Sequence, residues 1–413
     1  MASMAVIIEG REAAQMSTAL HGFTAKDIFE MGLAYDYMYD TWTSMHWGDE
    51  FLGKALIATI PIGSLKDAQG CHICVVGEAG IGKSHSQHCA IKLIPREYKF
   101  NGTITPQSLY YSSDIITPGS IINIDDLVWS DSLGATIKKI TSVFSNQVQK
   151  LSVNNGEAIL ESAVERPTFW ISQVEMQADE QIRDRFIIVD IEGSKERIEE
   201  VKEFMNRNDR GDGISSSELD MKIEVCQNIV RILREQGVIE VVIPFADRIK
   251  TSGNLRAHRM FMDLVKSFTI FDFMNRKKDD RSRLIAIEDD FIRAKDIFDG
   301  IGGTSSNKYT SKERGILQSI IDNGYRASFA EVSSKTGINE QYIRDIVFGR
   351  GKDQQQKHGL ISKCNALSYD NKIRPYKLRL GKDVDMGPAQ VELIPVQDEI
   401  SKHEPIAEEP ITA

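Results

Sequence analysis

The chain has 413 residues, 41% of them hydrophobic and 27% charged, a composition that predicts an ordinary folded protein of two or three domains. No apolar run of about 18 residues is present, and no basic segment precedes the short apolar stretch at the N-terminus, so we expect neither a membrane partner nor a secretory signal. Five scattered cysteines, an odd number, exclude a disulfide framework and favour a reducing compartment, so we expect a cytoplasmic location.

The charge of the chain is unevenly distributed. A net charge of −10 at first argues against a nucleic-acid partner, because phosphate groups attract cationic surfaces. However, residues 308–382 carry 15 Lys and Arg against 7 Asp and Glu, a difference of +8. Residues 386–413 carry six acidic residues against Lys402 alone, a difference of −5. A basic module is therefore followed by an acidic tail.

Alternation of strands and helices indicates the fold class. Short β-branched runs at Ile73–Val76, Ile121–Ile124, Phe169–Ile171 and Phe186–Ile191 are separated by helical segments, the pattern of a parallel sheet covered by helices. The small polar residues Gly302–Asn307 predict a linker. We expect, in chain order, an N-terminal helical segment (1–45), an α/β core (46–192), an α-helical lid (193–300), a basic domain (308–382) and an acidic disordered tail (386–413).

The segment GEAGIGKS has the pattern of a phosphate-binding loop, with a hydrophobic strand before it and a helix-compatible stretch after it. Its glycines allow the backbone amides to turn toward an anion. Lys83 can reach the β and γ phosphates, and the hydroxyl of Ser84 can bind Mg²⁺. We therefore predict that ATP and Mg²⁺ bind at Gly77, Glu78, Ala79, Gly80, Ile81, Gly82, Lys83 and Ser84.

Two acidic residues follow the next hydrophobic strand. The strand Ser120–Ile124 ends in Asp125 and Asp126, which suits a Walker B strand. The first acid would hold Mg²⁺ and the second would polarise the attacking water. The alternative is an acidic strand end without a catalytic role, since adjacent acids are common.

Over residues 46–300 these motifs occur in an order that resembles the mini-chromosome-maintenance (MCM) branch of the AAA+ helicases. The segment HWGDEFLGKALIATIPIG is similar to the lead-in that precedes the phosphate loop in that branch, and INIDD follows the loop. The segment QKLSVNNGEAILESAVERPTFWIS resembles the β-hairpin and strand before sensor 1, with Asn154, Asn155 and Gly156 as a tight turn. In the family this hairpin projects into the channel of a ring and contacts DNA; Lys150 is the cation close to it here.

The resemblance also implies catalytic residues beyond the loop. Sensor 1 falls on Gln173, with Ser172 as the second choice. The segment DEQIRDRFIIVDI is similar to the family's "LLSRFDL" segment, which makes Arg185 an arginine finger for the nucleotide of the neighbouring subunit, with Arg183 able to exchange roles. The alternative for either arginine is a surface residue before a strand.

A further segment implies sensor 2. RMFMDLVKSFTIF resembles the family's "RQLEALIRLAEA" helix and assigns sensor 2 to Arg259, with Arg256 as the fallback. An arginine supplied by a neighbour requires a homo-oligomer, and the family implies a hexamer. The stretch ahead of residue 46 is too short for the family's N-terminal oligonucleotide-binding domain, so we expect a shortened or diverged relative of the kind that mobile elements or viruses encode.

The basic module has the element order of a winged helix, with three helices followed by a β-hairpin. A turn at residues 335–338 leads into the helix from which such folds read the major groove, which carries Tyr342, Arg344 and Arg350. The hairpin, or wing, offers cations that could reach phosphates: Lys372, Arg374, Lys377 and Arg379. The alternative is a protein-docking or regulatory module.

Cysteines and histidines crowd around the phosphate loop, and a CxxC pair has the spacing of zinc ligands. Residues 71 and 74 would point to opposite faces of the strand, however, and the later residues would lie on the following helix. We therefore interpret the following as buried thiols and surface histidines: Cys71, His72, Cys74, His85, His88 and Cys89.

Three functions remain open at this stage. The leading hypothesis is an ATPase that drives a DNA helicase or translocase in replication, in which Arg185 and Arg259 stabilise developing charge. The second is an initiator or helicase loader that uses ATP to assemble on DNA; Asp126 favours it, because these motors usually have Glu there and a shorter acid predicts slow hydrolysis. The third is a DNA-binding regulator whose ATPase region is a structural platform.

Overall fold

A parallel five-stranded sheet lies at the centre of the structure, a computed structural model that describes residues 22–154, 157–174, 180–191, 193–251, 255–301, 309, 311–349, 359–364, 366–370, 376–382 and 391–394. The strand order is β2-β3-β6-β1-β7, and all four neighbouring pairs are parallel. The carboxyl ends of the strands therefore share one edge. The bounds are β1 His72–Val76, β2 Lys99–Asn101, β3 Ile121–Ile124, β6 Thr168–Gln173 and β7 Phe186–Asp190.

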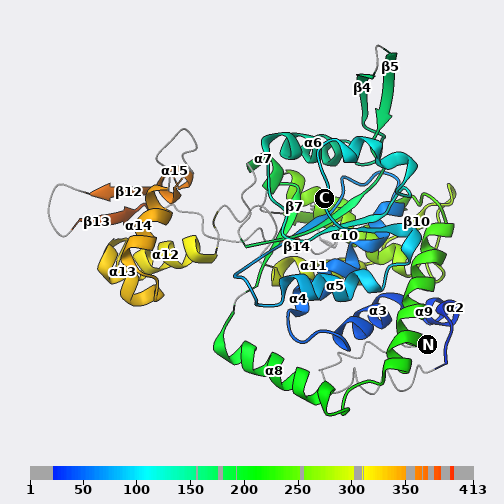
Figure 1. The fold of residues 1–413 in the computed structure, drawn as a ribbon, viewed down its shortest axis with the longest axis horizontal. Coiled ribbons are helices and arrows are strands. Elements are labelled where there is room, and N and C mark those ends of the chain that lie inside the picture. The colour runs from blue at the N-terminus through cyan, green and yellow to red at the C-terminus, as the bar shows by residue number, and fades with distance from the viewer. Residues whose placement is uncertain are drawn as a thin grey trace, which may run out of the picture.

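Helices cover both faces of this sheet, as the alternation of strands and helices predicts (Figure 1). Successive residues of β1 enter different cores: Ile73 and Val75 pack with the helices of one face, and Cys74 packs with those of the other. The first face carries α4 (Glu50–Ala58) and α5 (Lys83–Lys92), and the second carries α6 (Asp131–Ser142). The core is thus a mixed α/β P-loop fold with the predicted parallel sheet.

Further helices lie before, between and after these strands. They are α7 Glu180–Arg183, α8 Lys195–Asp209, and the 3-10 helices η1 Ile60–Ser64, η2 Arg96–Tyr98, η3 Ser108–Asp114 and η4 Ala246–Arg248. Side-chain caps set several helix starts. Ser130 accepts a hydrogen bond from the Leu133 amide ahead of α6, and Ser194 does the same for Arg197 ahead of α8.

The N-terminal helices pack into the same core as the sheet. Phe29, Met38 and Trp42 are fully buried against helices from beyond residue 193, so the division at residue 45 does not follow the packing. Residues 193–300 are mostly helical, as expected, but also contribute short strands. The bounds are α2 Ala25–Glu30, α3 Ala34–Thr43, α9 Ser216–Glu235, α10 Leu255–Phe271, α11 Glu288–Gly300, β8 Val241–Val242, β9 Ile249–Thr251 and β10 Leu284–Ile285.

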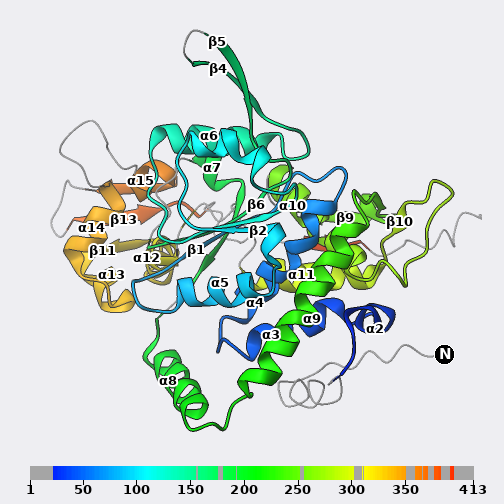
Figure 2. The same ribbon diagram turned by 45° about the vertical axis from the view of Figure 1, so that its right-hand side comes forward.

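The predicted β-hairpin is confirmed. Strands β4 (Gln149–Asn154) and β5 (Glu157–Ser162) pair in antiparallel register, and the hairpin projects beyond α6 in both views (Figures 1 and 2). Asn154 pairs with Glu157, which leaves a two-residue connection; its residues 155 and 156 lie outside the described part of the chain. Apolar side chains of the hairpin are exposed: Leu151 is 72% exposed and Val153 is 73% exposed.

The basic module has a separate hydrophobic core and the predicted order of helices before a β-hairpin. A capping box between Ser328 and Glu331 starts α13, and Gly337 ends it with a left-handed φ of 70°. An unpredicted strand, β11, extends the hairpin to a sheet of order β11-β13-β12. The bounds are α12 Ser311–Asp322, β11 Arg326–Ser328, α13 Phe329–Thr336, α14 Glu340–Phe348, α15 Leu360–Lys363, β12 Leu367–Asp370 and β13 Lys377–Leu380.

The prediction that the whole acidic tail is disordered is wrong for residues 391–394. Strand β14 (Val391–Leu393) pairs in antiparallel register with β9, and Val391 is fully buried. The VEL segment adds a strand beside β9. A prediction made from the overall composition of the tail cannot detect such a short strand. Within the described residues no helix is both long and apolar enough to cross a membrane.

Candidate nucleotide-binding site

The phosphate loop connects the end of β1 to the start of α5. Gly77, Gly80 and Gly82 have φ values of 151°, 82° and 101°, within the left-handed region that favours glycine. A Cβ on Gly77 would lie 2.7 Å from the Ile191 carbonyl oxygen, so this position also has no room for a side chain. The loop therefore presents backbone amides next to the N-terminus of α5, which is the arrangement that binds phosphate.

Lys83 and Ser84 occupy the positions that the motif requires. Lys83 is 5% exposed, and its ammonium group donates a hydrogen bond of 2.6 Å to the Glu78 carbonyl oxygen, so it curls over the loop. The hydroxyl of Ser84 donates to Asp125 Oδ1 at 2.5 Å. The Glu78 side chain points outward, 77% exposed, with a carboxylate oxygen 3.7 Å from Lys312 Nζ.

Asp125 and Asp126 lie at the carboxyl end of β3, beside the loop. Burial opposes ionisation of Asp125, but hydrogen bonds from Ser172 and Ser84 outweigh it and hold the pKa of this carboxyl below its usual value. Asp125 is therefore an anion at neutral pH. A hydroxyl and a carboxylate are the hard oxygen donors that suit Mg²⁺, so the pair fits the predicted ion. Asp126 has a left-handed φ of 45°, and its amide donates to Ser172 Oγ at 3.2 Å.

The preference for Gln173 over Ser172 as sensor 1 does not match the structure. Strand β6 lies between β1 and β3, so its end reaches the loop and Asp125 together. Ser172 donates to Asp125, whereas the amide of Gln173 is used elsewhere: its nitrogen donates to the Leu127 carbonyl, and its oxygen accepts from Trp129 Nε1 at 2.9 Å. Ser172 is thus the residue in contact with the candidate magnesium ligand, and Gln173 holds the segment after Asp126.

Arg185 is not positioned as a projecting arginine finger. It is 9% exposed, and its guanidinium donates to the Gln181 carbonyl and, at 2.6 Å, to the Ser142 hydroxyl. These contacts hold it inside its own protomer. Its alternative, Arg183, lies one helical turn from the start of β7 and is half-buried, so it replaces Arg185 as the candidate for a contact with a neighbour.

Arg259 and Arg256 lie away from the phosphate loop of their own chain. Both are exposed near the start of α10, and Arg256 is 3.8 Å from Asp184 Oδ2. One turn further along α10, Asp263 accepts hydrogen bonds from the amides of residues 69 and 70, just before β1. The loop follows the other end of this strand, roughly 16 Å away at about 3.3 Å per residue. This placement does not support a sensor 2 role for Arg259 at the nucleotide of its own chain.

The sequence reasoning missed Arg197, at the start of α8. Its guanidinium donates to the Ile81 carbonyl oxygen of the loop at 2.9 Å and to both carboxylate oxygens of Asp49, at 3.1 and 2.5 Å. Burial opposes ionisation of Asp49, but hydrogen bonds from His46 and Arg197 prevail and lower the pKa of the carboxyl. No local pattern marks Arg197, because 148 residues separate it from Asp49.

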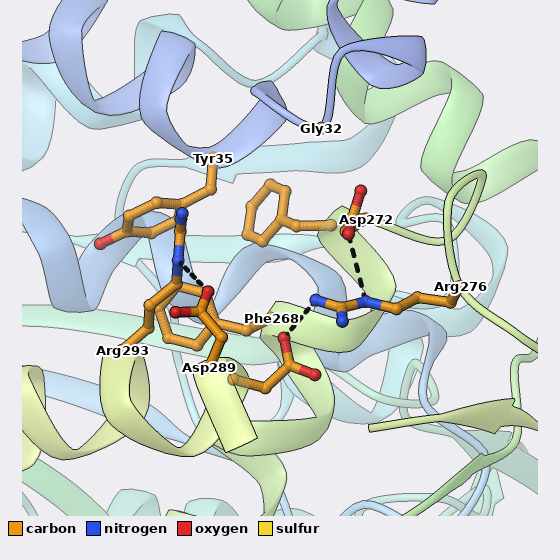
Figure 3. Close-up of a pocket in the computed structure, with 9 residues that line it drawn as sticks. Gly32, Tyr35, Phe268, Asp272, Arg276, Asp289 and Arg293 are labelled. Carbon is orange, nitrogen blue, oxygen red and sulfur yellow. Dashed lines mark hydrogen bonds and ion pairs between the residues drawn. The ribbon is translucent and has the colours of Figure 1, made fainter. Parts of the chain in front are cut away.

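A separate pocket between α3, α10 and α11 is a charged junction and not a second candidate for the nucleotide (Figure 3). Arg276 pairs with Asp290 at 2.6 Å and with Asp272 at 3.2 Å, and Arg293 pairs with Asp289 at 3.1 Å. Each arginine that lines the pocket is thus neutralised by an acid of the same lining. The network ties the ends of α10 and α11 together.

Comparison with known proteins agrees with this geometry. Residues 21–236 match the family model described as the MTBMA_p00010 P-loop domain, a span that covers more than half of the chain and includes the loop, Asp125 and Ser172. The chain belongs to this P-loop family. A curated relative, the uncharacterized protein MTBMA_p00010 of Methanothermobacter marburgensis, is 22% identical over an alignment of 353 positions that covers 78% of this chain. The match spans only 43% of that relative's length.

Membership of this P-loop family sets the general chemistry of the site. A P-loop domain binds a nucleotide, typically together with Mg²⁺, and supports nucleoside triphosphate hydrolysis. Lys83, Ser84 and Asp125, which the sequence assigns to this task, lie together at one edge of the sheet. Ser172 and Arg197 join them from more distant parts of the chain.

Proposed function

We propose that this chain is an ATPase that works as a ring, most simply a hexamer, and drives a DNA helicase or translocase in replication. The supporting observation is that the nucleotide-binding residues and the candidate arginines lie toward opposite edges of the sheet. Lys83, Ser84 and Asp125 lie at its carboxyl edge, whereas Arg183 and Arg259 lie toward its amino edge. In the proposed ring, the arginines of one chain complete the nucleotide site of the neighbouring chain. MCM-like AAA+ subunits are arranged in this way.

Within one site the residues divide the work. The loop amides and Lys83 bind the phosphates, and Ser84 and Asp125 hold Mg²⁺, which would offset the charge of the β and γ phosphates. Asp126 orients the water, and Ser172 fixes the position of both acids through its contacts with Asp125 and the Asp126 amide. Arginines from the next subunit stabilise the charge that develops as the γ phosphate leaves.

DNA contact is proposed for the winged helix formed by residues 311–382. Tyr342 is 39% exposed on α14, and Lys377 and Arg379 lie on the wing strand β13. Two residues limit the surface: Arg379 pairs with Asp370 at 2.6 Å, and Arg344 stacks 4.0 Å from the Phe329 ring centre. The predicted contacts of Arg350, Lys372 and Arg374 lie outside the described residues.

The hairpin β4–β5 is the second proposed DNA element. Its only cation within the described strands, Lys150, is 3.4 Å from the Glu161 carboxylate, so it has little charge to offer a phosphate. The exposed apolar side chains of Leu151, Val153 and Leu160 suit contact with bases or sugars of a single strand better than with its backbone.

The decisive experiment removes the ammonium group from the loop. Lys83→Ala should abolish ATP retention, ATP turnover and ATP-dependent displacement of a duplexed strand. The matched control is Lys92→Ala, an exposed lysine on the last turn of the same helix, which should leave all three unchanged. Turnover that survives in Lys83→Ala would refute the motor, and negative-stain images with ATP and single-stranded DNA would test the ring directly.

A second candidate function is an initiator or helicase loader that assembles on DNA with ATP and hydrolyses it slowly. Asp126 favours it, because its side chain is shorter than the usual Glu and its backbone is held at a left-handed φ of 45° with its amide bonded to Ser172. ATP-dependent assembly on DNA without strand displacement would support this candidate over the helicase. A DNA-binding regulator would instead lose DNA binding on truncation at residue 302, with ATP irrelevant to the binding.

A further inference from the structure

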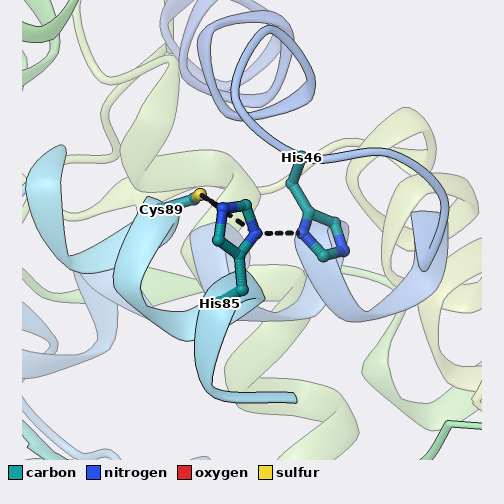
Figure 4. A group of neighbouring side chains, drawn as sticks. All are labelled: His46, His85 and Cys89. Carbon is teal, nitrogen blue, oxygen red and sulfur yellow. Dashed lines mark hydrogen bonds between the residues drawn. The ribbon is translucent and has the colours of Figure 1, made fainter. Parts of the chain in front are cut away.

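Three potential metal ligands converge beside the phosphate loop (Figure 4). His46 follows α3, and His85 and Cys89 lie on α5. The Nδ1 atoms of the two histidines are 3.0 Å apart, and Cys89 Sγ is 3.8 Å from the His85 ring nitrogens. One ligand atom from each of the three residues can be chosen so that all lie within 4.8 Å of one another. The sequence analysis considered His85 and Cys89 as metal ligands but did not consider His46.

The fold fixes this arrangement through buried neighbours. His85 and Cys89 are four residues apart on a helix, so their side chains share one face. The segment that carries His46 is anchored over that face by Trp42, whose indole donates to the Ser86 carbonyl at 3.0 Å. Trp42 is fully buried and Cys89 is 2% exposed. Core packing therefore fixes the positions of His46 and Cys89, and the exposed His85 side chain lies between them.

Two of the three ligand-to-ligand distances are close to those around a tetrahedral ion. Zinc bonds of about 2.05 Å to nitrogen and about 2.3 Å to sulfur place two nitrogens about 3.3 Å apart and a nitrogen and a sulfur about 3.6 Å apart. The observed separations, 3.0 and 3.8 Å, lie within a few tenths of an ångström of these values. Two imidazole nitrogens that face one another at 3.0 Å can share at most one proton comfortably, whereas an ion between them uses both lone pairs.

A second, independent feature is the carboxylate behind His46. Asp49 Oδ2 lies 2.8 Å from His46 Nε2, and both groups are buried. A carboxylate that accepts the Nε2 proton leaves the Nδ1 lone pair directed at His85, which is the arrangement that orients histidine ligands in zinc sites. Asp49 is held in turn by Arg197, which also contacts the loop through the Ile81 carbonyl.

We propose that His46, His85 and Cys89 bind a divalent transition-metal ion of the zinc type, with an open fourth position on the exposed side of His85. Two imidazoles and a thiolate are borderline-to-soft donors, which separates this site from the oxygen-lined Mg²⁺ site at Ser84 and Asp125. Uptake of the ion releases the Cys89 thiol proton to water. The ion would join the segment before the loop to the helix after it, and through Asp49 and Arg197 it would brace the loop itself.

Cobalt titration of the full chain tests this site without reference to ATPase activity. After removal of bound metal with a chelator, Co²⁺ should bind with a single equivalent, give a thiolate-to-cobalt absorption band in the near ultraviolet, and be displaced by Zn²⁺. Cys89→Ser should abolish the band. His85→Ala should weaken Co²⁺ affinity at least about 10-fold, the scale on which even an indirect change at a metal site acts.

The control is His88→Ala, an exposed histidine on the same helix that is absent from the ligand group. It should bind Co²⁺ as the unmodified chain does. His85 is itself exposed, so His85→Ala should fold, and its far-ultraviolet circular dichroism checks this. Stoichiometric uptake that is unaltered in His85→Ala and Cys89→Ser, or absence of uptake in the unmodified chain, would overturn the proposal and leave a hydrogen-bonded trio.

Discussion

Ser172→Ala tests the geometry of the candidate hydrolytic site at one atom. Its hydroxyl donates to Asp125 Oδ1 and accepts from the Asp126 amide at 3.2 Å. Removing it takes one of the two hydroxyl donors from the candidate magnesium ligand and leaves the Asp126 amide without its partner in a left-handed backbone conformation. We expect both acids to lose alignment while the loop keeps its shape.

The expected loss can be estimated from the bonds. A hydrogen bond to a charged group contributes about 1.5–3 kcal/mol, which corresponds to roughly 10- to 150-fold in an equilibrium or rate constant. Asp125 is partly exposed, so water can replace some of the lost donation and the lower end applies. Ser172→Ala should therefore reduce kcat/KM for Mg·ATP about 10-fold and raise the Mg²⁺ concentration needed for half-maximal turnover.

Steady-state ATP hydrolysis over a range of Mg²⁺ concentrations measures both effects. The matched control is Ser120→Ala, a fully buried serine at the start of β3 whose hydroxyl donates to the Thr117 carbonyl at 2.6 Å, at the edge of the sheet remote from the loop. It should cost some stability and leave the Mg²⁺ dependence unchanged. Turnover by Ser172→Ala within about 2-fold of the unmodified chain, at unchanged Mg²⁺ dependence, would refute the role given to this hydroxyl.

Three further predictions concern the arginines, a buried acid and a helix contact. Arg185→Ala should lower the free energy of unfolding by about 1–3 kcal/mol, because it empties a buried hydrogen-bonded position, whereas Arg183→Ala should leave thermal melting unchanged and reduce only ATP turnover. Burial raises the pKa of Asp263 from 3.8 to about 7. The folded chain therefore binds more protons than the unfolded chain between about pH 4 and pH 7, and the free energy of unfolding falls as the pH rises through that window. Asp263→Asn should therefore stabilise the chain against denaturant at pH 8 and not at pH 4; equal effects at both pH values would contradict this. Gly53→Ala should destabilise by several kcal/mol in thermal unfolding, because its Cβ would lie 2.3 Å from the buried Trp42 ring; an unchanged melting temperature would show that this contact can relax.

Features coded in a short stretch of sequence could be predicted. The loop glycines, Lys83 and Ser84 follow from one motif between a strand and a helix, and their φ values and contacts are as that motif requires. Asp125 was predicted because a hydrophobic strand after the loop ends in two acids, the pattern of a Walker B strand, and its contact with Ser84 agrees with that prediction. The hairpin was predicted from the resemblance of its segment to that of MCM helicases, together with the turn residues Asn154, Asn155 and Gly156.

Features that depend on tertiary contacts could not be predicted from the same patterns. Ser172 and Gln173 are neighbours in sequence, but Ser172 donates to Asp125, whereas the Gln173 amide is bonded to Trp129 and to the Leu127 carbonyl. Arg185 matches a motif, yet Ser142 from α6 draws its guanidinium inward. His46 lies 39 residues from His85 in sequence, so no short spacing marks the two as metal ligands. They come together only because α3 packs near α5.

Two kinds of cation compete for the role of completing the nucleotide site. Arg197 is close enough in its own chain, but its guanidinium is already bonded to both oxygens of Asp49 and to the Ile81 carbonyl, so reaching a γ phosphate would cost three hydrogen bonds. Arg183 and Arg259 bear no such contacts to the loop and lie about a strand length away from it. Because these three bonds already occupy Arg197, the ring that we propose would take its completing cation from the neighbouring subunit. Arg197 then serves to hold the loop and the segment before it in place.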